Sequence, residues 1–427
     1  MTDAPIKQNS SLQDKQLEID HLHSIINATR LINSTLDLDE LMESIRKIAR
    51  DELQAEKATI FLGNEENQEL HSAYLEDPYL DINLTFGSGL AGMVAKTGKS
   101  IIIDDAQNDE RFYKGVDEIT GYVTKTVVCA PMYNKEQKLI GVFQVLNSKK
   151  GKFSESDRRF LEDLSIQAAL AIENAFLYSE AIEKKKLEEE LDLAHDIQQK
   201  LLPRSSPQIR GYDIYGVNIA AQAVGGDYFD FIDLDQSSLL FALGDVSGKG
   251  MAAALLMANL QASLRAQAGI HSHLTELTST LNAHIFNSTS STQYITFFSG
   301  ALNVKNNEIK YCNAGHNPPL LIKNNGEMDL LDKGGIPLGF IQNTVYSESV
   351  TSIEKGEILV VFSDGVTETF DENENEFGVS RLEELIRQNK NLGSEEIAER
   401  IITGLKEFAM GNPSADDVTL LILKRVI

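Results

Sequence analysis

The stretch AVGGDYFDFIDLDQSSLLFALGDVSGKG, residues 223–250, decides how the second half of this chain folds. Two runs of aromatic and branched side chains, 228–233 and 238–243, flank a polar segment and so predict a β-hairpin. Asp227 precedes the first strand and Asp245 follows the second. A turn midway between the runs pairs these acids across the hairpin, with Cβ atoms about 5 Å apart. Carboxylates this close repel each other unless a proton or a cation lies between them. This favours a divalent-cation site over the alternative, in which both acids are ordinary solvated residues at the open end of the hairpin.

Two further acidic positions follow the same pattern. Asp364 comes just after the apolar run 358–362, and the pair Asp416–Asp417 comes just before the run 418–423. If these runs are neighbouring antiparallel strands, their acids lie together at one end. Four carboxylates converging at one sheet edge have the charge to hold two divalent ions, and oxygen ligands favour magnesium or manganese over zinc.

The composition is that of a globular protein with a strongly acidic balance. The 427 residues are enough for two to three domains. Acidic residues outnumber basic ones 64 to 39, a formal net charge of -25, which argues against nucleic-acid or anionic-membrane partners. Two cysteines imply no disulfide framework, and the sequence shows neither a signal peptide nor a membrane-spanning apolar run. We therefore expect a cytoplasmic protein.

Changes of hydrophobic period predict four segments. A polar tail, over about the first 14 residues, and a helix occupy 1–36, and strands with a short helix fill 37–160. A long helix through 161–203 leads to many short strands and paired helices over 204–427. The first large segment is predicted to be a sheet with helices packed on it, and the second a two-layer or four-layer α/β sandwich.

The first large segment resembles a GAF domain, a module that senses small molecules or dimerises. The resemblance rests on GSGLAGMVAKTGKSIIIDDAQNDERF, GYVTKTVVCAPM and LIGVFQVLNSKKGKF. Its motifs are most similar to those of the GAF domains of cyclic-nucleotide-regulated enzymes, whose motif matches here at Asn147, Phe153 and Asp157. Ser148 and Arg158 depart from that motif.

A small ligand of this domain is a further expectation. The backbone N–H groups near Gly87 and Gly89, where a short helix is predicted to start, can hold an anion. The alternative is that both glycines serve only a tight turn.

The connecting helix is predicted to be continuous, because neither proline nor glycine occurs between Phe153 and Leu202. An apolar stripe with the three-and-four spacing of a two-stranded coiled coil comprises Leu161, Leu164, Ala168, Ala171, Ala175, Tyr178 and Ile182. After a phase break at residues 183–186, the spacing resumes with Leu187, Leu191, Ala194, Gln198 and Leu201. We expect a parallel homodimer through this helix; the alternative is two helices that pack on their own domains.

The second half resembles the metal-dependent PPM (phosphatase 2C-like) phosphatases, in particular the bacterial branch that acts in sigma-factor partner switching and sporulation. The matching motifs are LAHDIQQKLLP, AVGGDYFDF, LGDVSGKGMAAALLMA, NAGHNPPLL, FSDGVTE and ADDVTLLIL. The resemblance implies an α/β (α+β) fold with a pair of sheets flanked by helices, an αββα sandwich. It also implies two Mn²⁺ or Mg²⁺ ions at one end, with the ligands Asp227, Asp245, the Val246 carbonyl, Asp364 and Asp416, or Asp417 in place of Asp416.

The same resemblance implies the activity. A water activated by two metals would hydrolyse phosphoserine or phosphothreonine on a regulatory protein, an anti-sigma-factor antagonist with a STAS domain. Asp227 and Asp245 would be the catalytic carboxylates, with Asp245 bridging both ions. Control would pass from the GAF domain through the coiled coil, by a helix movement that reshapes the loop near Asp364.

Two alternatives and two departures from the family pattern accompany this interpretation. The chain could be a catalytically inactive scaffold that binds partners, although its acid set is complete. A cyclic-nucleotide hydrolase would need clustered histidines, and the eight here are scattered. The loop after Asp245 has no histidine that could protonate the leaving group. No arginine of this sequence can be assigned as a phosphate-binding residue near Asp227. Lys249 is the candidate for electrostatic help, and His316 for either an acid or loop packing.

Overall fold

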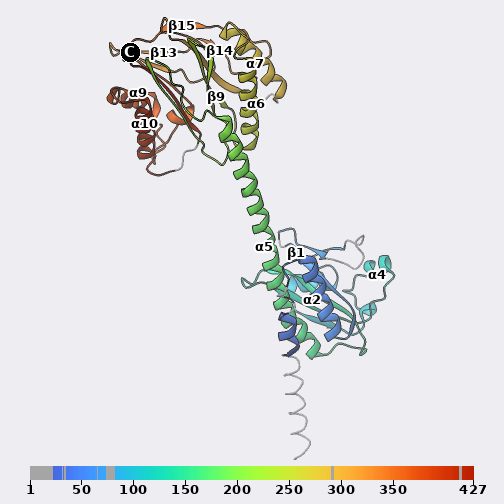
Figure 1. Ribbon diagram of the computed structural model, residues 1–427. Coiled ribbons are helices and arrows are strands. Elements are labelled where there is room, and N and C mark those ends of the chain that lie inside the picture. Colours follow the sequence, from blue (N-terminus) through green and yellow to red (C-terminus); the bar gives the residue numbers. More distant parts are fainter. Residues whose placement is uncertain are drawn as a thin grey trace, which may run out of the picture. The chain divides into compact units, whose positions relative to one another are not determined.

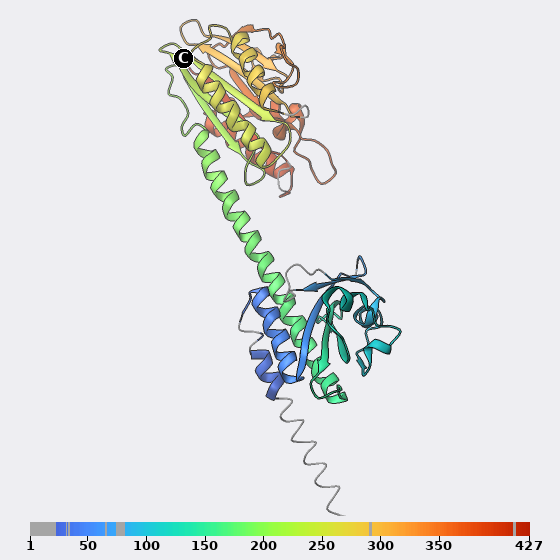
Figure 2. The ribbon, with the colours of Figure 1, turned by 90° about the vertical axis from the view of Figure 1, so that its right-hand side faces the viewer.

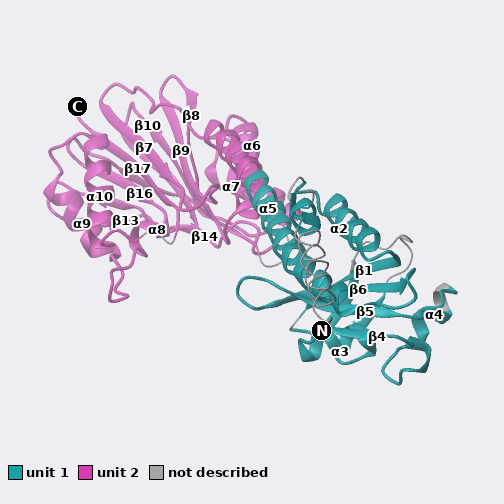
Figure 3. Cartoon of the chain, turned by 90° about the horizontal axis from the view of Figure 1, so that it is seen from below, with its two compact units in different colours: residues 1–186 teal, residues 187–427 magenta. Residues whose placement is uncertain are grey.

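The computed structural model describes residues 23–30, 32, 35–64, 66–73, 82–289, 293–412 and 416–427. The chain divides into two compact units, residues 1–186 and 187–427 (Figure 3). The boundary falls within one helix, α5 (Glu155–Leu201). The predicted N-terminal tail lies outside the described residues.

The first unit is built on a six-stranded antiparallel sheet. Two hairpins lie within this sheet, with β1 against β2 and β5 against β6. The strands in spatial order are β3 (Asn83–Thr85), β2 (Glu69–Ala73), β1 (Ala55–Asn64), β6 (Leu139–Ser148), β5 (Val127–Tyr133) and β4 (Ile101–Ile103).

Helices cover both faces of this sheet (Figure 2). The amphipathic helix α2 (Leu38–Glu52), capped by the Asp37 side chain, packs on one face beside the start of α5. The short helix α3 (Gly89–Thr97) buries Leu90 and Val94 on the other face. A 3₁₀ turn, η1 (Ala106–Asn108), and α4 (Gly115–Thr120) complete the unit.

The long helix is continuous, as predicted, but its apolar stripe is largely used within the chain. Five of the seven predicted stripe positions before the phase break pack into the core of the first unit: Leu161, Leu164, Ala168, Ala171 and Ala175. Tyr178 and Ile182 are about half exposed, at 49% and 50%. Near the other end, Gln198 is buried and Leu201 packs against the core of the second unit. A coiled coil between two copies of this helix would therefore have to form through the middle of the helix.

The second unit is a sandwich of two sheets. The first contains, in spatial order, β14 (Gly334–Gly335), β11 (Glu308–Ala314), β10 (Ile295–Asn303), β9 (Ser238–Val246) and β8 (Tyr228–Asp235), with β15 (Ser349–Ser352) also beside β11. The second contains β13 (Met328–Leu330), β12 (Leu320–Ile322), β16 (Ile358–Phe362), β17 (Val418–Arg425) and β7 (Tyr212–Ile219).

Helices form the outer layers of the sandwich (Figure 1). The helices α6 (Met251–Gln267) and α7 (Leu274–Ser288) pack over the first sheet, and α9 (Gly378–Gln388) and α10 (Ser394–Phe408) over the second. A single turn, α8 (Asp364–Thr367), follows β16. One core fills the space between the sheets and under α6 and α7, and another lies under α9 and α10, which confirms the αββα architecture.

The hairpin register agrees with the prediction. Tyr228 pairs with Gly244 at the open end of β8 and β9, so Asp227 and Asp245 lie opposite each other one step further. The predicted convergence at one sheet edge is wrong, however. These two acids extend from the first sheet, whereas Asp364 and Asp416 flank β16 and β17 of the second. The acids meet at one end of the sandwich because the two sheets are packed face to face.

Among the residues that the structure describes, none of the helices combines the length and the apolar character that crossing a membrane would require.

Candidate metal centre

Asp227 and Asp245 form the interior part of the site. Asp227 is 3% exposed, and Asp245 lies opposite it at the open end of the hairpin. Burial, reinforced by the charge of Asp245, raises the pKa of Asp227 well above its usual value. Burial and the charges of Asp364 and Asp416 raise the pKa of Asp245 to about 7. This excess of buried negative charge is the electrostatic situation that a bound cation relieves.

Asp364 and Asp416 reach the site from the second sheet. Because β16 and β17 pair antiparallel, with Phe362 opposite Leu420, the end of one strand lies beside the start of the other. Burial, then the charges of Glu368 and Asp416, raise the pKa of Asp364 to about 6. All four acids of the predicted set thus influence one another.

The neighbouring acids Asp416 and Asp417 have different surroundings. The Asp417 carboxylate is buried and accepts backbone N–H groups from Ala221 at 2.8 Å, Gly226 at 2.7 Å and Asp227 at 3.3 Å. The Asp416 side chain is 39% exposed, and one of its oxygens lies 2.9 Å from the Lys249 ammonium. Both Asp417 oxygens are therefore occupied by the backbone, whereas Asp416 faces the open side of the site.

Glycines allow this close packing. A Cβ atom on Gly225 would collide with the Asp417 carboxylate, and one on Gly365 would collide with the Asp417 carbonyl. A Cβ on Gly226 would lie 3.1 Å from the Val246 carbonyl oxygen, so that oxygen lies against the glycine segment before Asp227. Val246 is thereby placed where its carbonyl can join the carboxylates.

The residues fit a hard divalent cation. A cleft of about 10 Å³, room for one ion or water, lies between the segments 221–226 and 248–250, with Asp416 and Asp417 on its wall. The donors nearby are carboxylates and a carbonyl, the oxygen ligands that Mg²⁺ and Mn²⁺ prefer. Within the described ranges, no three acids, histidines or cysteines are drawn together tightly enough to hold an ion as they stand. Binding would thus require small inward movements of these carboxylates.

The remaining candidates have other surroundings. His316 is 5% exposed, its Nδ1 lies 2.8 Å from the Thr296 hydroxyl, and burial lowers its pKa to about 4. Its burial and its contact with Thr296 favour the packing role over that of an acid. In α6, Arg265 lies 2.7 Å and 3.0 Å from the two oxygens of the buried Asp230. Arg265 is thereby committed to an internal ion pair.

The end of α5 contacts the segment just before Asp227. The buried Gln198 amide accepts from the Gly225 N–H at 3.0 Å and donates to the Gly225 carbonyl at 2.7 Å. His195 Nδ1 lies 2.6 Å from the Ala223 carbonyl. The sequence interpretation used Gln198 only as a stripe position, since no local pattern indicates a contact with a glycine 27 residues further on.

The predicted GAF ligand residues have structural contacts of their own. Asn147 accepts from the N–H groups of Lys125 and Thr126 and donates to Glu56 and the Val123 carbonyl. Asp157 caps α5 by accepting from Ser154, and Lys150 lies 3.6 Å away.

Gly87 and Gly89 form the turn before α3, with φ of 93° and 66°. The Gly87 N–H donates to the Gly92 carbonyl at 2.7 Å, so this donor is used within the turn.

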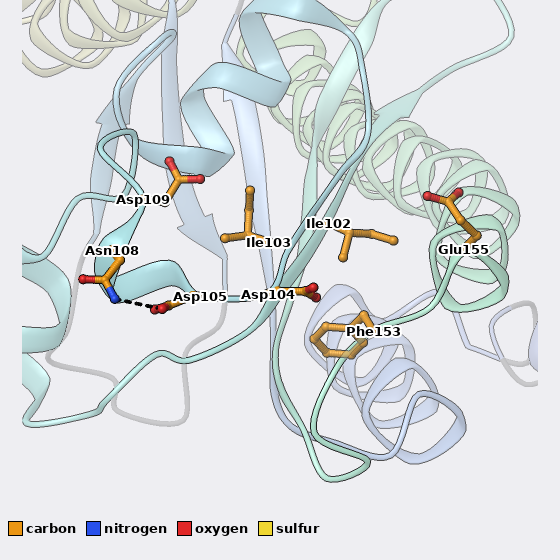
Figure 4. Close-up of a pocket in the computed structure, with 8 residues that line it drawn as sticks. All are labelled: Ile102, Ile103, Asp104, Asp105, Asn108, Asp109, Phe153 and Glu155. Carbon is orange, nitrogen blue, oxygen red and sulfur yellow. Dashed lines mark hydrogen bonds between the residues drawn. The ribbon is translucent and has the colours of Figure 1, made fainter.

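An open groove of about 590 Å³ lies elsewhere on the first unit (Figure 4). Phe153 is the one predicted ligand residue on its wall, which also contains Ile102, Ile103, Asp104, Asp105, Asn108, Asp109 and Glu155. The other four predicted residues, Gly87, Gly89, Asn147 and Asp157, are not on the wall of this groove. Several of the acids already have partners, such as Lys152 for Asp104 and Arg111 for Asp109.

Comparison with known proteins identifies the family. The chain is 30% identical over 249 residues to the phosphoserine phosphatase RsbU of Bacillus subtilis (strain 168), covering 57% of this chain and 72% of RsbU. The chain belongs to the RsbU family. Membership makes it a protein phosphatase, and the motifs that predicted this activity are confirmed at the level of the family. The family model for stage II sporulation protein E (SpoIIE) matches residues 235–426, and a GAF domain model matches residues 35–173.

A solved structure supports the fold of this RsbU-family chain. The SiaA-PP2C domain of Pseudomonas aeruginosa superposes with a TM-score of 0.51 at 19% identity, covering 57% of this chain and 99% of that domain. A match of another kind is the dual 3',5'-cyclic-AMP and -GMP phosphodiesterase 11 of Drosophila melanogaster, 37% identical over 119 residues. It covers 27% of this chain but 8% of that enzyme.

Proposed function

We propose that the second unit hydrolyses phosphoserine or phosphothreonine on a regulatory protein, with a water activated between two divalent cations, Mn²⁺ or Mg²⁺. The observation that carries this proposal is the meeting of acids from two sheets, whose mutual repulsion and burial raise the pKa values of Asp227, Asp245 and Asp364. When bound, two such ions lower the pKa of a water held between them and neutralise charge on a phosphoryl group.

The proposed ligands are Asp227, Asp245, the Val246 carbonyl, Asp364 and Asp416, with Asp245 shared between the ions. Asp416 is preferred to Asp417 because its carboxylate is 39% exposed at the site, whereas the buried Asp417 carboxylate accepts three backbone N–H groups. Asp417 instead fixes the segment that leads into Asp227. Lys249 lies at the rim beside Asp416 and brings a positive charge to the side from which an anionic phosphoryl group approaches.

The proposed substrate is a phosphorylated STAS-domain protein that antagonises an anti-sigma factor. Similarity to RsbU and the SpoIIE match support a place in partner switching. The test is release of phosphate from such a protein, phosphorylated on its regulatory serine or threonine, compared with the same protein phosphorylated elsewhere. Equal rates on both would contradict a specific substrate.

We further propose that the protein is a homodimer through the middle of α5 and that a ligand of the GAF unit sets its activity. The half-exposed Tyr178 and Ile182, followed by Leu187 at 58% exposure, offer the apolar surface. Sedimentation at micromolar concentration is expected to show a dimer that Ile182→Glu converts to a monomer. A monomeric wild-type protein would contradict the dimer. The ligand residues Gly87, Gly89, Asn147, Phe153 and Asp157 stay a prediction.

The activity itself is tested with a generic phosphomonoester and Mn²⁺. The wild-type protein is expected to turn over only with the metal, and Asp364→Asn to lose turnover by about three orders of magnitude. Asp332→Asn, at an exposed loop position, is the matched control and is expected to behave as the wild type. A wild-type protein that binds Mn²⁺ without turnover would indicate that a partner must activate it. One that binds no Mn²⁺ would favour the inactive scaffold.

A further inference from the structure

Thr419 joins the two sheets directly at the candidate metal centre. It lies on β17, two residues after Asp417, and is fully buried. Its hydroxyl donates to Oδ2 of Asp227 at 2.5 Å, across 192 residues of sequence. The strand of one sheet therefore holds a carboxylate that extends from the other.

A second contact favours this direction of the hydrogen bond. Asn218 lies opposite Thr419 on β7, and its amide nitrogen donates to the Thr419 hydroxyl oxygen at 2.8 Å. A threonine hydroxyl has one hydrogen and two acceptor positions. Because Asn218 occupies one acceptor position, the single hydrogen is available to Oδ2 of Asp227, which accepts it in the ionised state that binds a cation.

The backbone of Thr419 is fixed as well. Its N–H donates to the Ser363 hydroxyl at 2.9 Å, and its carbonyl accepts from the Ser363 N–H at 3.1 Å. Ser363 is also fully buried and immediately precedes Asp364. The Thr419 side chain therefore has little freedom to turn away from Asp227.

We propose that Thr419 is a positioning residue for the metal centre: with Asn218 behind it, its hydroxyl occupies Oδ2 of Asp227 and presents the other carboxylate oxygen to a divalent cation. This inference rests on the proposed metal-dependent function. Without the hydroxyl, the Asp227 carboxylate can rotate between its neighbours, and the cation must supply the energy to orient it. Partners behind a metal ligand typically contribute 10–100-fold to metal affinity.

The experiment measures Mn²⁺ binding by titration calorimetry and by electron paramagnetic resonance on the full chain, independently of turnover. Thr419→Val keeps the shape of the side chain and removes the hydroxyl, and Thr419→Ser restores it. Thr278→Val is the matched control, because Thr278 is equally buried but donates to the Leu274 carbonyl within α7. Asn218→Ala provides a second variant that leaves the Thr419 side chain in place.

Thr419→Val is expected to weaken Mn²⁺ binding by about 10–100-fold and to broaden the Mn²⁺ resonance, with kcat largely recovered at saturating metal. Thr419→Ser and Thr278→Val are expected to bind within about threefold of the wild type, and Asn218→Ala to lie between. Wild-type binding that Thr419→Val leaves unchanged would overturn this inference alone. Should Thr419→Val fail to fold, unchanged binding by Asn218→Ala would do the same. Absence of Mn²⁺ binding in the wild type would overturn the metal-dependent function and this inference together.

Discussion

Asp417 and Gly226 are joined by a 2.7 Å hydrogen bond from the glycine N–H to the carboxylate, across 191 residues of sequence. This bond fixes the backbone one residue before Asp227 and belongs to a set of three that occupies both Asp417 oxygens. It separates two adjacent acids that look alike in the sequence. Asp417 is buried and accepts three backbone N–H groups from the segment before Asp227, whereas Asp416 is 39% exposed and accepts the Asp417 N–H.

Asp416→Asn and Asp417→Asn are therefore expected to fail in different ways. Asp416→Asn is expected to retain the wild-type melting temperature and lose Mn²⁺ affinity and turnover. Asp417→Asn is expected to destabilise the fold by about 1–3 kcal/mol, because an amide group cannot accept all three N–H groups. Calorimetric unfolding in chelator and Mn²⁺ titration distinguish the two. Equal loss of stability in both variants would contradict this division of roles.

The stability of the metal-free protein is expected to depend on the charge of Asp245. Its pKa in the folded protein is about 7, above its ordinary value of 3.8, so folding favours the protonated form. That contribution is complete below about pH 4 and is lost as the pH rises through 7. Asp245→Asn is expected to match the wild type below about pH 4, and its stability advantage over the wild type is expected to grow by about 2–3 kcal/mol between pH 5 and pH 8.

Thermal unfolding in chelator at both pH values checks this difference. The same ionisation implies that Mn²⁺ binding releases protons and tightens as the pH rises from 6 to 8, because the cation favours the charged carboxylates. Calorimetry in two buffers of different ionisation enthalpy measures the release. Binding that is independent of pH over this range would contradict the raised pKa values of Asp245 and Asp364.

Gln198→Ala is expected to lower kcat/KM by about tenfold, because Gly225 loses both hydrogen bonds to α5 and the Asp227 segment is held less precisely. Gln199→Ala is the matched control, since the neighbouring glutamine is exposed. The Mn²⁺ concentration that gives half-maximal activity is expected to rise with Gln198→Ala alone. If both variants behaved as the wild type, the end of α5 would have no influence on the site.

Insertions within residues 183–186 are expected to change activity according to helical register. Each added residue rotates the following part of a helix by about 100°, so seven residues nearly restore the original face and four turn it by about 40°. Phosphatase activity with insertions of two to seven residues, on the phosphoprotein substrate, measures the effect. Activity that is indifferent to insertion length would contradict control through α5.

Most of the fold could be predicted because its elements have strong local signals. The aromatic and branched run 228–233 predicted its strand to within two residues, because β8 spans Tyr228–Asp235. The arrangement of the two sheets could not be predicted in this way. The sequence shows that an acid lies at the start or the end of a strand. It does not show to which of the two sheets that strand belongs. The convergence at one sheet edge was wrong for that reason.

Within the site, acids were easier to predict than the side chains that hold them. Asp364 and Asp416 stand out because charges are unusual beside buried strands. Thr419 and Ser363 do not, since threonine and serine are ordinary residues in or beside a strand. The role of Thr419 depends on its contact with Asp227, which only the packed sheets create, and Ser363 acts through Thr419. The apolar stripe of α5 was ambiguous for a similar reason, because packing on a domain and on a second helix require the same spacing.

The glycines around Asp417 offer a diagnostic for related sequences. A side chain at Gly225 would collide with the Asp417 carboxylate, and one at Gly365 with its carbonyl. A relative that retains every acid but replaces either glycine could not assemble this end of the sandwich. The acidic residues of such a chain would not reveal that it had lost catalysis. The residues at the positions of Gly225 and Gly365 would reveal it, although glycine has no functional group.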